Sequence, residues 1–276
     1  MTSASGGLAG QIAGLAVPHG AVAIWALGQS GFVLKGGETI AYIDPYLSDS
    51  IADGGGPARR FPAPIAPQDV THATIVLATH EHRDHTDAPT LLPLLAASPQ
   101  ASLIASVQAK HALAGTGLDP ARILTPKLGE RTALGGLACT PIPAAHYGYE
   151  VDDAGHSRYM GFLIEINGIT IYHSGDTLVF PELLAALEGR RVDIAMLPIN
   201  GRDYFREQQQ ITGNTNPAEA IELALAIEAK VLLGCHNDLF ATNRVPPGTL
   251  WDELDRRAPF QRCHILQPGE LYVYMG

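Results

Sequence analysis

The residues most able to do chemistry stand together in one short segment of the chain. Thr79 is followed by His-Glu-His-Arg-Asp-His, which places His80, His82, Asp84 and His85 within six positions. Imidazole and carboxylate groups are ligands for divalent transition metals. Alternate residues at a strand end project to one side, so His80 and His82 can share one cation, while the following turn can direct Asp84 and His85 toward a second. The spacing H-x-H-x-D-H therefore predicts a site for two cations.

The alternative for this segment is a solvated turn that merely carries charge. Clustered imidazoles repel one another when protonated unless a metal holds them neutral, so we favour the metal site. One turn cannot supply every ligand of two cations, and distant segments must provide the rest. His146, Asp176 and His236 each follow an apolar run that is typical of a strand. Each alone would more often be a capping or core residue, but their shared position after strands makes them candidates.

Short apolar and β-branched runs separated by Gly, Pro and Asp predict the strands that position these residues. The predicted strands are 21–27, 31–34, 39–43, 74–78, 102–105, 137–142, 162–166, 169–173, 194–197, 231–233 and 271–274. One predicted helix begins near residue 88, and four others span 108–114, 181–187, 217–229 and 249–257. Asn167-Gly168 predicts a tight hairpin, and Asn216 is the expected N-cap of the helix at Pro217. Hairpins followed by strand–helix alternation predict an α/β fold of two mixed sheets packed face to face, with helices outside.

The chain has 276 residues, and no linker or repeat divides it, so we expect a single domain over residues 21–276. Residues 1–20 contain no Asp, Glu, Lys or Arg and several glycines, which predicts a flexible lead-in. A secretory signal needs a positively charged start and a continuous apolar core, and this segment has neither. The uncharged run 88–109 contains three prolines, which argues against a membrane-spanning helix.

Charge and cysteine usage narrow the function classes. The net charge of −10 disfavours a duplex nucleic-acid partner, because binding to phosphates requires basic surface. The three cysteines, at positions 139, 235 and 263, match no zinc-knuckle spacing and cannot form a complete set of disulfides. They favour reduced thiols and a cytoplasmic protein without a membrane partner.

The sequence resembles the metallo-β-lactamase superfamily, and the resemblance extends from Ile24 to the C-terminus. The resemblance lies in the H-x-H-x-D-H segment, in Trp-Ala-Leu-Gly-Gln-Ser-Gly-Phe (25–32) and in Ile-Asp-Pro-Tyr-Leu-Ser (43–48). Pro-Ile-Asn-Gly-Arg-Asp (198–203), Gly-Asn-Thr (213–215) and Cys-His-Asn-Asp (235–238) are similar to the branch that contains the L-ascorbate-6-phosphate lactonases. The resemblance implies the four-layer αβ/βα sandwich of that superfamily. Lactonases of this branch tend to oligomerise, so it also implies a homo-oligomer.

The resemblance also implies a ligand set. Carried over by position, it assigns His80, His82 and His146 to one cation, Asp84, His85 and His236 to a second, and Asp176 as the bridge between them. Asp44 would hold a ligand histidine from behind, which is compatible with an Asx turn before Pro45. Imidazoles and carboxylates without a thiolate suit zinc, manganese or iron. Because the superfamily mostly uses zinc and this branch is associated with manganese, we expect two Zn²⁺ or Mn²⁺ ions.

The expected activity is hydrolysis by a metal-activated hydroxide. The substrate class implied by the resemblance is a small polar lactone, sugar-derived and anionic, with Asp84 and Asp176 relaying protons. The alternative is a phosphodiesterase or nuclease with the same binuclear site. A redox di-iron protein is less favoured because no flavin domain follows, and a non-catalytic scaffold because no ligand position is lost.

Candidate substrate-binding residues are chosen by charge and position. Arg202 is the best candidate for an anionic group, since a guanidinium suits phosphate and carboxylate. Arg59 and Arg60 lie in the Gly/Pro-rich loop 53–67, where they would either cover the substrate or form a solvated charged pair. Tyr147, next to His146, would line the pocket, and Asn200 is a weaker candidate. The motif leaves Arg83 unrestricted, which predicts a surface residue.

Overall fold

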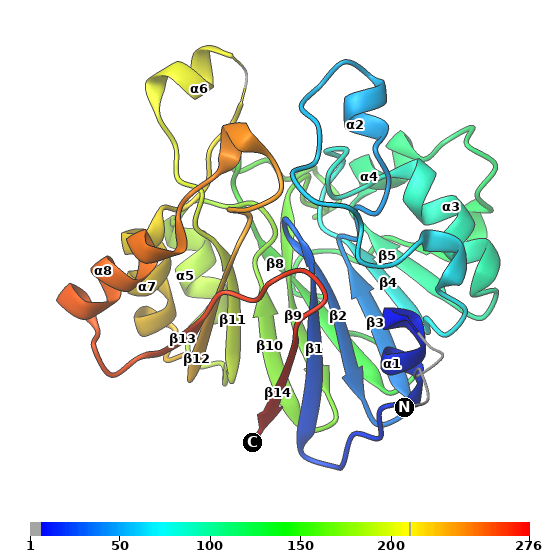
Figure 1. Cartoon of the computed structure of the whole chain (residues 1–276), viewed down its shortest axis with the longest axis horizontal. Coiled ribbons are helices and arrows are strands. Elements are labelled where there is room, and N and C mark those ends of the chain that lie inside the picture. The colour runs from blue at the N-terminus through cyan, green and yellow to red at the C-terminus, as the bar shows by residue number, and fades with distance from the viewer. Residues whose placement is uncertain (1–6, 210) are drawn as a thin grey trace, which may run out of the picture.

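Two seven-stranded mixed sheets form the centre of the computed structural model, which describes residues 7–209 and 211–276 (Figure 1). The first sheet contains, in order, β14 (Leu271–Met275), β1 (Ala21–Gly28), β2 (Gly31–Gly36), β3 (Thr39–Ile43), β4 (Ile75–Ala78), β5 (Ser102–Ala105) and β6 (Ile123–Leu124). The second contains β13 (Arg262–His264), β12 (Val231–Cys235), β11 (Ile194–Pro198), β10 (Ile169–His173), β9 (Met160–Ile166), β8 (Leu137–Pro143) and β7 (Thr132–Leu134). Strand β14 pairs antiparallel with β1, so the last strand of the chain closes the edge of the first sheet.

The inner strands of the sheets are buried on both faces, as strand β1 illustrates. All eight of its residues are buried. Ile24 joins the core between the two sheets, whereas its neighbour Trp25 joins the core under the helices. Successive side chains of a strand point to opposite faces, so a strand covered on both sides reads as a continuous apolar run.

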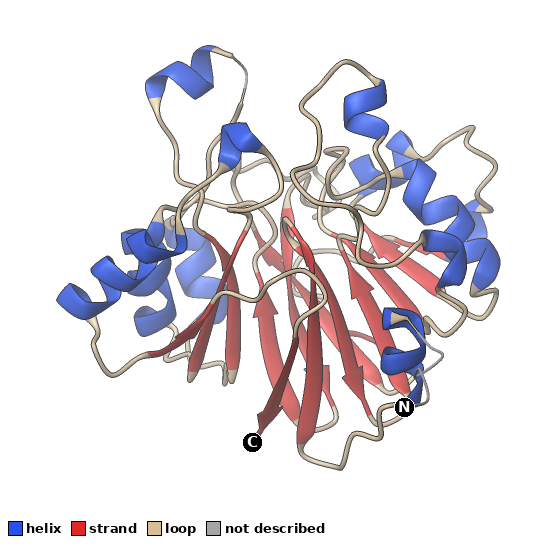
Figure 2. Cartoon of the chain, viewed as in Figure 1, coloured by secondary structure: helices blue, strands red, loops and turns tan. Residues whose placement is uncertain are grey.

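Helices cover the outer face of each sheet, and the strands lie between them (Figure 2). The first sheet is covered by α1 (Leu8–Gly14), α3 (Ala88–Ala97) and α4 (Val107–Ala112). The second is covered by α5 (Pro181–Leu187), α7 (Pro217–Ala226) and α8 (Pro247–Arg257). Two short helices, α2 (Ser50–Asp53) and α6 (Tyr204–Gln208), belong to the loops beyond the strand ends. Within the described residues, no helix has both the length and the hydropathy that crossing a bilayer requires.

The predicted α/β sandwich is confirmed. The strands predicted at 39–43, 102–105 and 169–173 have the same bounds in the structure. The helix predicted at Pro217 begins there, and Asn216 and Glu219 form a reciprocal capping box at its start. The short strands β6, β7 and β13 were not predicted, because each has only two or three residues and takes its strand conformation from pairing with a longer neighbour.

The N-terminal segment differs from the flexible lead-in expected over residues 1–20. Residues 1–6 lie outside the described part, but Leu8–Gly14 forms α1, and Ile12 is fully buried against the first sheet. The Lys35 ammonium donates hydrogen bonds to the carbonyl oxygens of Ile12 at 2.8 Å and Ala13 at 2.7 Å. These carbonyls belong to the last turn of α1, where cations are stabilised. An apolar anchor and a buried cation therefore hold the helix in place.

Candidate metal centre

The predicted ligands lie at one edge of the sandwich, where strands of both sheets end (upper edge in Figure 1). The His80–His85 turn follows β4 of the first sheet. His146, Asp176 and His236 follow β8, β10 and β12 of the second sheet. The parallel pairing of β10, β11 and β12 brings the carboxyl ends of those strands to the same edge. Segments more than 150 positions apart in the sequence thereby meet at one place.

The structure brings the seven predicted ligands into three overlapping groups. Within each group, one potential ligand atom per residue lies within 4.8 Å of the others. The groups are His80, His82 and His146; His80, His85 and Asp176; and Asp84, His85 and His236. The first and third groups contain the residues that the sequence assigns to separate cations. The middle group joins them through shared histidines and the central carboxylate, which is the arrangement a bridge requires.

Asp176 is the centre of the cluster. Its Oδ1 lies 3.3 Å from His85 Nε2, and its Oδ2 lies 3.6 Å from His146 Nε2 and 3.2 Å from His236 Nε2. Atoms that share one cation at about 2.1 Å are separated by roughly 3.0–3.5 Å. The carboxylate therefore reaches histidines from both predicted ligand sets at the spacing of a common coordination sphere.

Unsatisfied buried atoms test whether this site suits a cation. His80 Nε2, His85 Nε2 and Asp176 Oδ1 are buried and have no hydrogen-bond partner. Orphaned polar atoms are costly in a folded protein, and buried polar groups normally find partners. Once deprotonated, these three atoms offer lone pairs of the kind that divalent transition metals bind. The cluster therefore fits a metal better than it fits a closed hydrogen-bond network.

Asp44 holds His85 from the side away from the cluster. Its Oδ2 lies 2.7 Å from His85 Nδ1 and accepts a hydrogen bond from the Thr79 hydroxyl, also at 2.7 Å. Its Oδ1 accepts the Thr79 backbone N–H at 2.8 Å. With Nδ1 occupied in this way, Nε2 of His85 is left to face Asp176. Such partners fix the tautomer and orientation of a metal-binding histidine.

Burial and charge divide the histidines into two kinds. Burial lowers the pKa of His80, and it lowers the pKa of His146 to about 4, so both present neutral imidazoles. Burial also opposes protonation of His236, but the adjacent Asp176 and Asp84 carboxylates outweigh it and raise the pKa of His236 to about 9. Burial alone would raise the pKa of Asp84, yet the charge of His85 and a hydrogen bond with His236 lower it well below its usual range. In the metal-free chain, a proton on His236 thus balances the negative charge of the adjacent Asp84 and Asp176, which a bound cation would otherwise neutralise.

A cavity of about 530 Å³ opens over the cluster. His82, Asp84, Asp176 and His236 contribute to its lining, together with Tyr147. Gly54, Gly56 and Pro57 line another side, so part of the loop 53–67 borders the cavity as expected. A neighbouring cavity of about 640 Å³ shares His146 and Tyr147 with the first and extends to Arg202. Small-molecule sites commonly fall in this size range.

Some of the predicted substrate-binding residues line the two cavities in the structure, and others do not. Tyr147 lines both cavities, and Arg202 lines the second, where its guanidinium pairs with Glu219 at 2.8 Å. Arg59 does not line either cavity, because its guanidinium donates to the carbonyl oxygens of Tyr46, Ser48 and Phe61. Arg60 is likewise turned away and donates to the carbonyl oxygen of Asp238.

Asn200 also lies outside the two linings. It is buried, and its side-chain oxygen accepts from the Asn214 amide at 3.1 Å. Arg83 is exposed, as the sequence predicts, and it also lines the 530 Å³ cavity and donates to the carbonyl oxygen of Ser50. Of the two alternatives for Arg59 and Arg60, the contacts with backbone carbonyls argue against a role over the substrate.

Two further residues at the cluster were not predicted as site residues, although Gln29 lies within the segment 25–32 that carries the resemblance. The Gln29 side-chain amide lies 2.7 Å from Asp84 Oδ2 and 3.0 Å from His236 Nε2. The Tyr159 ring is buried beside His80 and His146, with ring centres 5.7 Å apart in both cases. Glutamine and tyrosine occur in many structural roles. Only the meeting of distant turns identifies them here.

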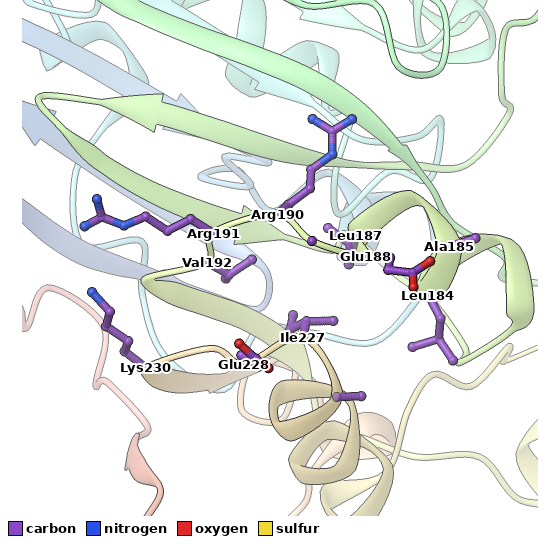
Figure 3. Close-up of a pocket in the computed structure, with 12 residues that line it drawn as sticks. Leu184, Ala185, Leu187, Glu188, Arg190, Arg191, Val192, Ile227, Glu228 and Lys230 are labelled. Carbon is purple, nitrogen blue, oxygen red and sulfur yellow. The ribbon is translucent and has the colours of Figure 1, made fainter.

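Another cavity, of about 790 Å³, lies at the other end of the second sheet (Figure 3). It is bordered by the segments that lead into β11 and β12, and no predicted site residue lines it. Of its basic residues, Arg191 and Lys230 both pair with the buried Asp193 carboxylate, at 2.9 Å and 2.8 Å. Their charges serve the fold at this end of the sheet.

Comparison with known proteins agrees with the fold. Residues 40–237 match the family model described as the beta-lactamase superfamily domain, a span that runs from β3 to His236. A metallo hydrolase from Ignicoccus hospitalis has a similar structure, with a TM-score of 0.71 over 93% of this chain and 99% of that one. At 20% identity, this likeness shows the fold alone.

Curated relatives narrow the family. A UPF0173 metal-dependent hydrolase from Desulfitobacterium hafniense is 31% identical over 264 residues, covering 92% of this chain and 96% of that protein. Another, from Archaeoglobus fulgidus, is 28% identical over 254 residues, covering 90% and 97%. The chain belongs to the metallo-β-lactamase superfamily and, within it, to the UPF0173 metal-dependent hydrolases.

Proposed function

We propose that this metal-dependent hydrolase holds two divalent cations and opens the ring ester of a small, polar, sugar-derived lactone. In this proposal His80, His82 and His146 bind one cation, and Asp84, His85 and His236 bind the other. Asp176 bridges them. The observation that carries the proposal is that the three ligand groups overlap through His80 and His85, with Asp176 in the middle group and on the lining of a cavity.

The ligand set suits either Zn²⁺ or Mn²⁺. Two such cations would generate hydroxide from water at neutral pH and polarise the carbonyl oxygen of an ester. The chain supplies the positions of the ligands and the movement of protons. The side chain of Asp84 is 18% exposed, whereas that of Asp176 is 4% exposed. Asp84 is therefore the carboxylate better placed to pass a proton to the departing alkoxide, and Asp176 the one better placed to hold the cluster together.

The cavity supports a small-molecule substrate. Its volume of about 530 Å³ accommodates a sugar-sized ring, and Arg83 and Tyr147 on its lining offer polar contacts. Arg202 in the adjoining cavity would meet an anionic group carried farther from the ester, although Glu219 already engages its guanidinium. We therefore expect the neutral lactones of this class to be hydrolysed as well as the anionic ones.

A substrate comparison tests the proposal. Purified protein loaded with Mn²⁺ or Zn²⁺ is assayed against aldonolactones and against bis-p-nitrophenyl phosphate, a general phosphodiester. We expect a higher kcat/KM for a lactone. A clear preference for the diester would replace the lactonase proposal with the phosphodiesterase alternative.

Two aspartate variants control this comparison. Asp176→Asn removes charge from the cluster and is expected to lower kcat by about 10²–10⁴-fold. Asp193→Asn changes an equally buried carboxylate at the opposite end of the second sheet and should leave kcat unchanged. Equal activity of the Asp176 and Asp193 variants would contradict a role for the cluster in catalysis.

A further inference from the structure

Gln29 is fixed against the metal cluster by its backbone. It lies in the turn between β1 and β2 with a φ of 56°, a left-handed conformation that glutamine seldom adopts. Its N–H donates to Asp238 Oδ1 at 2.9 Å, and its carbonyl oxygen accepts the N–H of His236 at 2.8 Å. His236 is itself left-handed, with a φ of 59°. Two strained residues thus hold each other in place, and such strain is concentrated at functional sites.

The side chain of Gln29 ends where a ligand of the second cation would lie. Its terminal amide is 2.7 Å from Asp84 Oδ2 and 3.0 Å from His236 Nε2, and those two atoms are 3.6 Å apart. Atoms that share one cation at about 2.1 Å are separated by roughly 3.0–3.5 Å. The amide therefore stands at about the spacing expected between members of one coordination sphere.

The present hydrogen bonds of the amide conflict with a bound cation. The amide nitrogen, which is a donor group, faces His236 Nε2, the atom whose lone pair His236 would give to the metal. The other end of the amide, Oε1, is buried with no hydrogen-bond partner, and the whole residue is 2% exposed. A half-turn about the last side-chain bond exchanges the two ends and brings an oxygen lone pair to the same place.

We propose that Gln29 is a neutral oxygen ligand of the second cation, beside Asp84, His85 and His236. This inference rests on the proposed two-cation site. An amide oxygen adds a hard ligand and raises the coordination number at that position. Hard oxygen ligands suit Mn²⁺, whereas sites that bind only zinc are usually four-coordinate. The chain would then favour Mn²⁺ at the second position more than its histidines alone predict.

Metal binding by two Gln29 variants tests the ligand role without an activity assay. Metal-free wild type, Gln29→Leu and Gln29→Glu are titrated with Mn²⁺, and free Mn²⁺ is counted by electron paramagnetic resonance. We expect wild type to bind two ions. Gln29→Leu should lower the affinity for the second ion by about tenfold or more, as is typical when a metal site loses one contact. Gln29→Glu should bind it at least as tightly as wild type, because a carboxylate supplies oxygen and negative charge.

The glutamate variant separates this role from simple support of Asp84. If Gln29 only donates an N–H to Asp84, glutamate would repel that carboxylate, and both variants would bind the second ion weakly. That result would overturn the ligand role, as would unchanged binding in Gln29→Leu. Gln100→Leu is the matched control, since Gln100 donates to the Ala73 carbonyl and is no part of the cluster. If wild type binds fewer than two ions, the two-cation function itself fails, and the ligand role fails with it.

Discussion

At the scale of single residues, the cluster combines side chains that form a motif with side chains that local backbone geometry holds in place. His80, His82, Asp84 and His85 are unusual in type and spacing, so a motif identifies them directly. Gln29 reaches the same cluster with an amide, which has no spacing rule, and its approach depends on a left-handed turn. Arg59 shows the reverse case, because its guanidinium donates to three carbonyl oxygens and does not line the cavities beside its loop. Charge predicts where an arginine could act, but local backbone geometry decides whether it is free.

Asp44→Asn tests how the cluster is held from behind. An asparagine can still accept from Thr79, but its N–H would face His85 Nδ1, where the structure has a carboxylate oxygen. The imidazole must then shift or change tautomer, and Nε2 loses its place toward the cation. We expect the affinity for the second metal ion to fall by about 10–100-fold, as measured by chelator competition.

Asp193→Asn is the matched control for this change. Asp193 is also fully buried and accepts a backbone N–H, from Thr170, but it lies far from the cluster. Both variants should lose about 1–3 kcal/mol in the free energy of unfolding, because both disturb a buried hydrogen-bonded carboxylate. Only Asp44→Asn should lose metal affinity. An equal loss of metal in the two variants would mean that Asp44 acts through general stability.

At the scale of elements, strands covered on both faces were the most predictable part of the chain. The strands Thr39–Ile43 and Ile169–His173 were bounded correctly because their apolar runs end at clear turn residues. The edge strands β6 and β7 were missed because two or three partly exposed residues carry no period. Helix α1 was missed for another reason: its glycines conceal a helix that depends on the contact of Ile12 with the first sheet. Tertiary contacts, which the local sequence does not contain, form these elements.

Gly175 follows β10 and packs against Thr79, the residue that follows β4. Its φ is 59°, and a Cβ atom there would lie 2.8 Å from the Thr79 side chain, which holds Asp44. Gly175→Ala should therefore displace Thr79 and reduce the metal bound per chain, as measured by elemental analysis. It should also lose about 1–2 kcal/mol of stability from the left-handed backbone.

Gly168→Ala provides the comparison for this variant. Gly168 has a φ of 85°, but a Cβ atom there would meet nothing within 4 Å. The two variants share the backbone penalty and differ in the collision. We expect Gly168→Ala to be destabilised to a similar extent and to keep its full metal content. Normal metal content in Gly175→Ala would show that Thr79 can yield without disturbing Asp44.

At the scale of the whole molecule, the cluster joins the two sheets. The His80–His85 turn belongs to the first sheet, and Asp176 and His236 belong to the second. A ligand that binds only the folded chain stabilises it by about 2.7 kcal/mol at a concentration of 100 times its Kd. For a chain of this size, that corresponds to a rise in Tm of roughly 5–10 °C.

Removing metal should therefore lower the melting temperature. We expect the protein to melt about 5–10 °C lower after chelation, and to recover when Mn²⁺ or Zn²⁺ is restored. Asp176→Asn, which weakens the bridge, should show a smaller difference in melting temperature between the metal-loaded and the chelated protein. A wild-type Tm that does not respond to saturating metal would contradict binding by the folded state.

The contact between Lys35 and α1 has a consequence for shortened forms of the protein. The Lys35 side chain is buried, and its ammonium is held by carbonyl oxygens of Ile12 and Ala13. Deleting residues 1–14 would remove both carbonyl partners of this ammonium, at a cost of about 1–3 kcal/mol. Lys35→Met in the same shortened chain should recover much of that loss in a urea titration. A segment that looks dispensable in the sequence thus supplies the hydrogen-bond acceptors of a buried ammonium group.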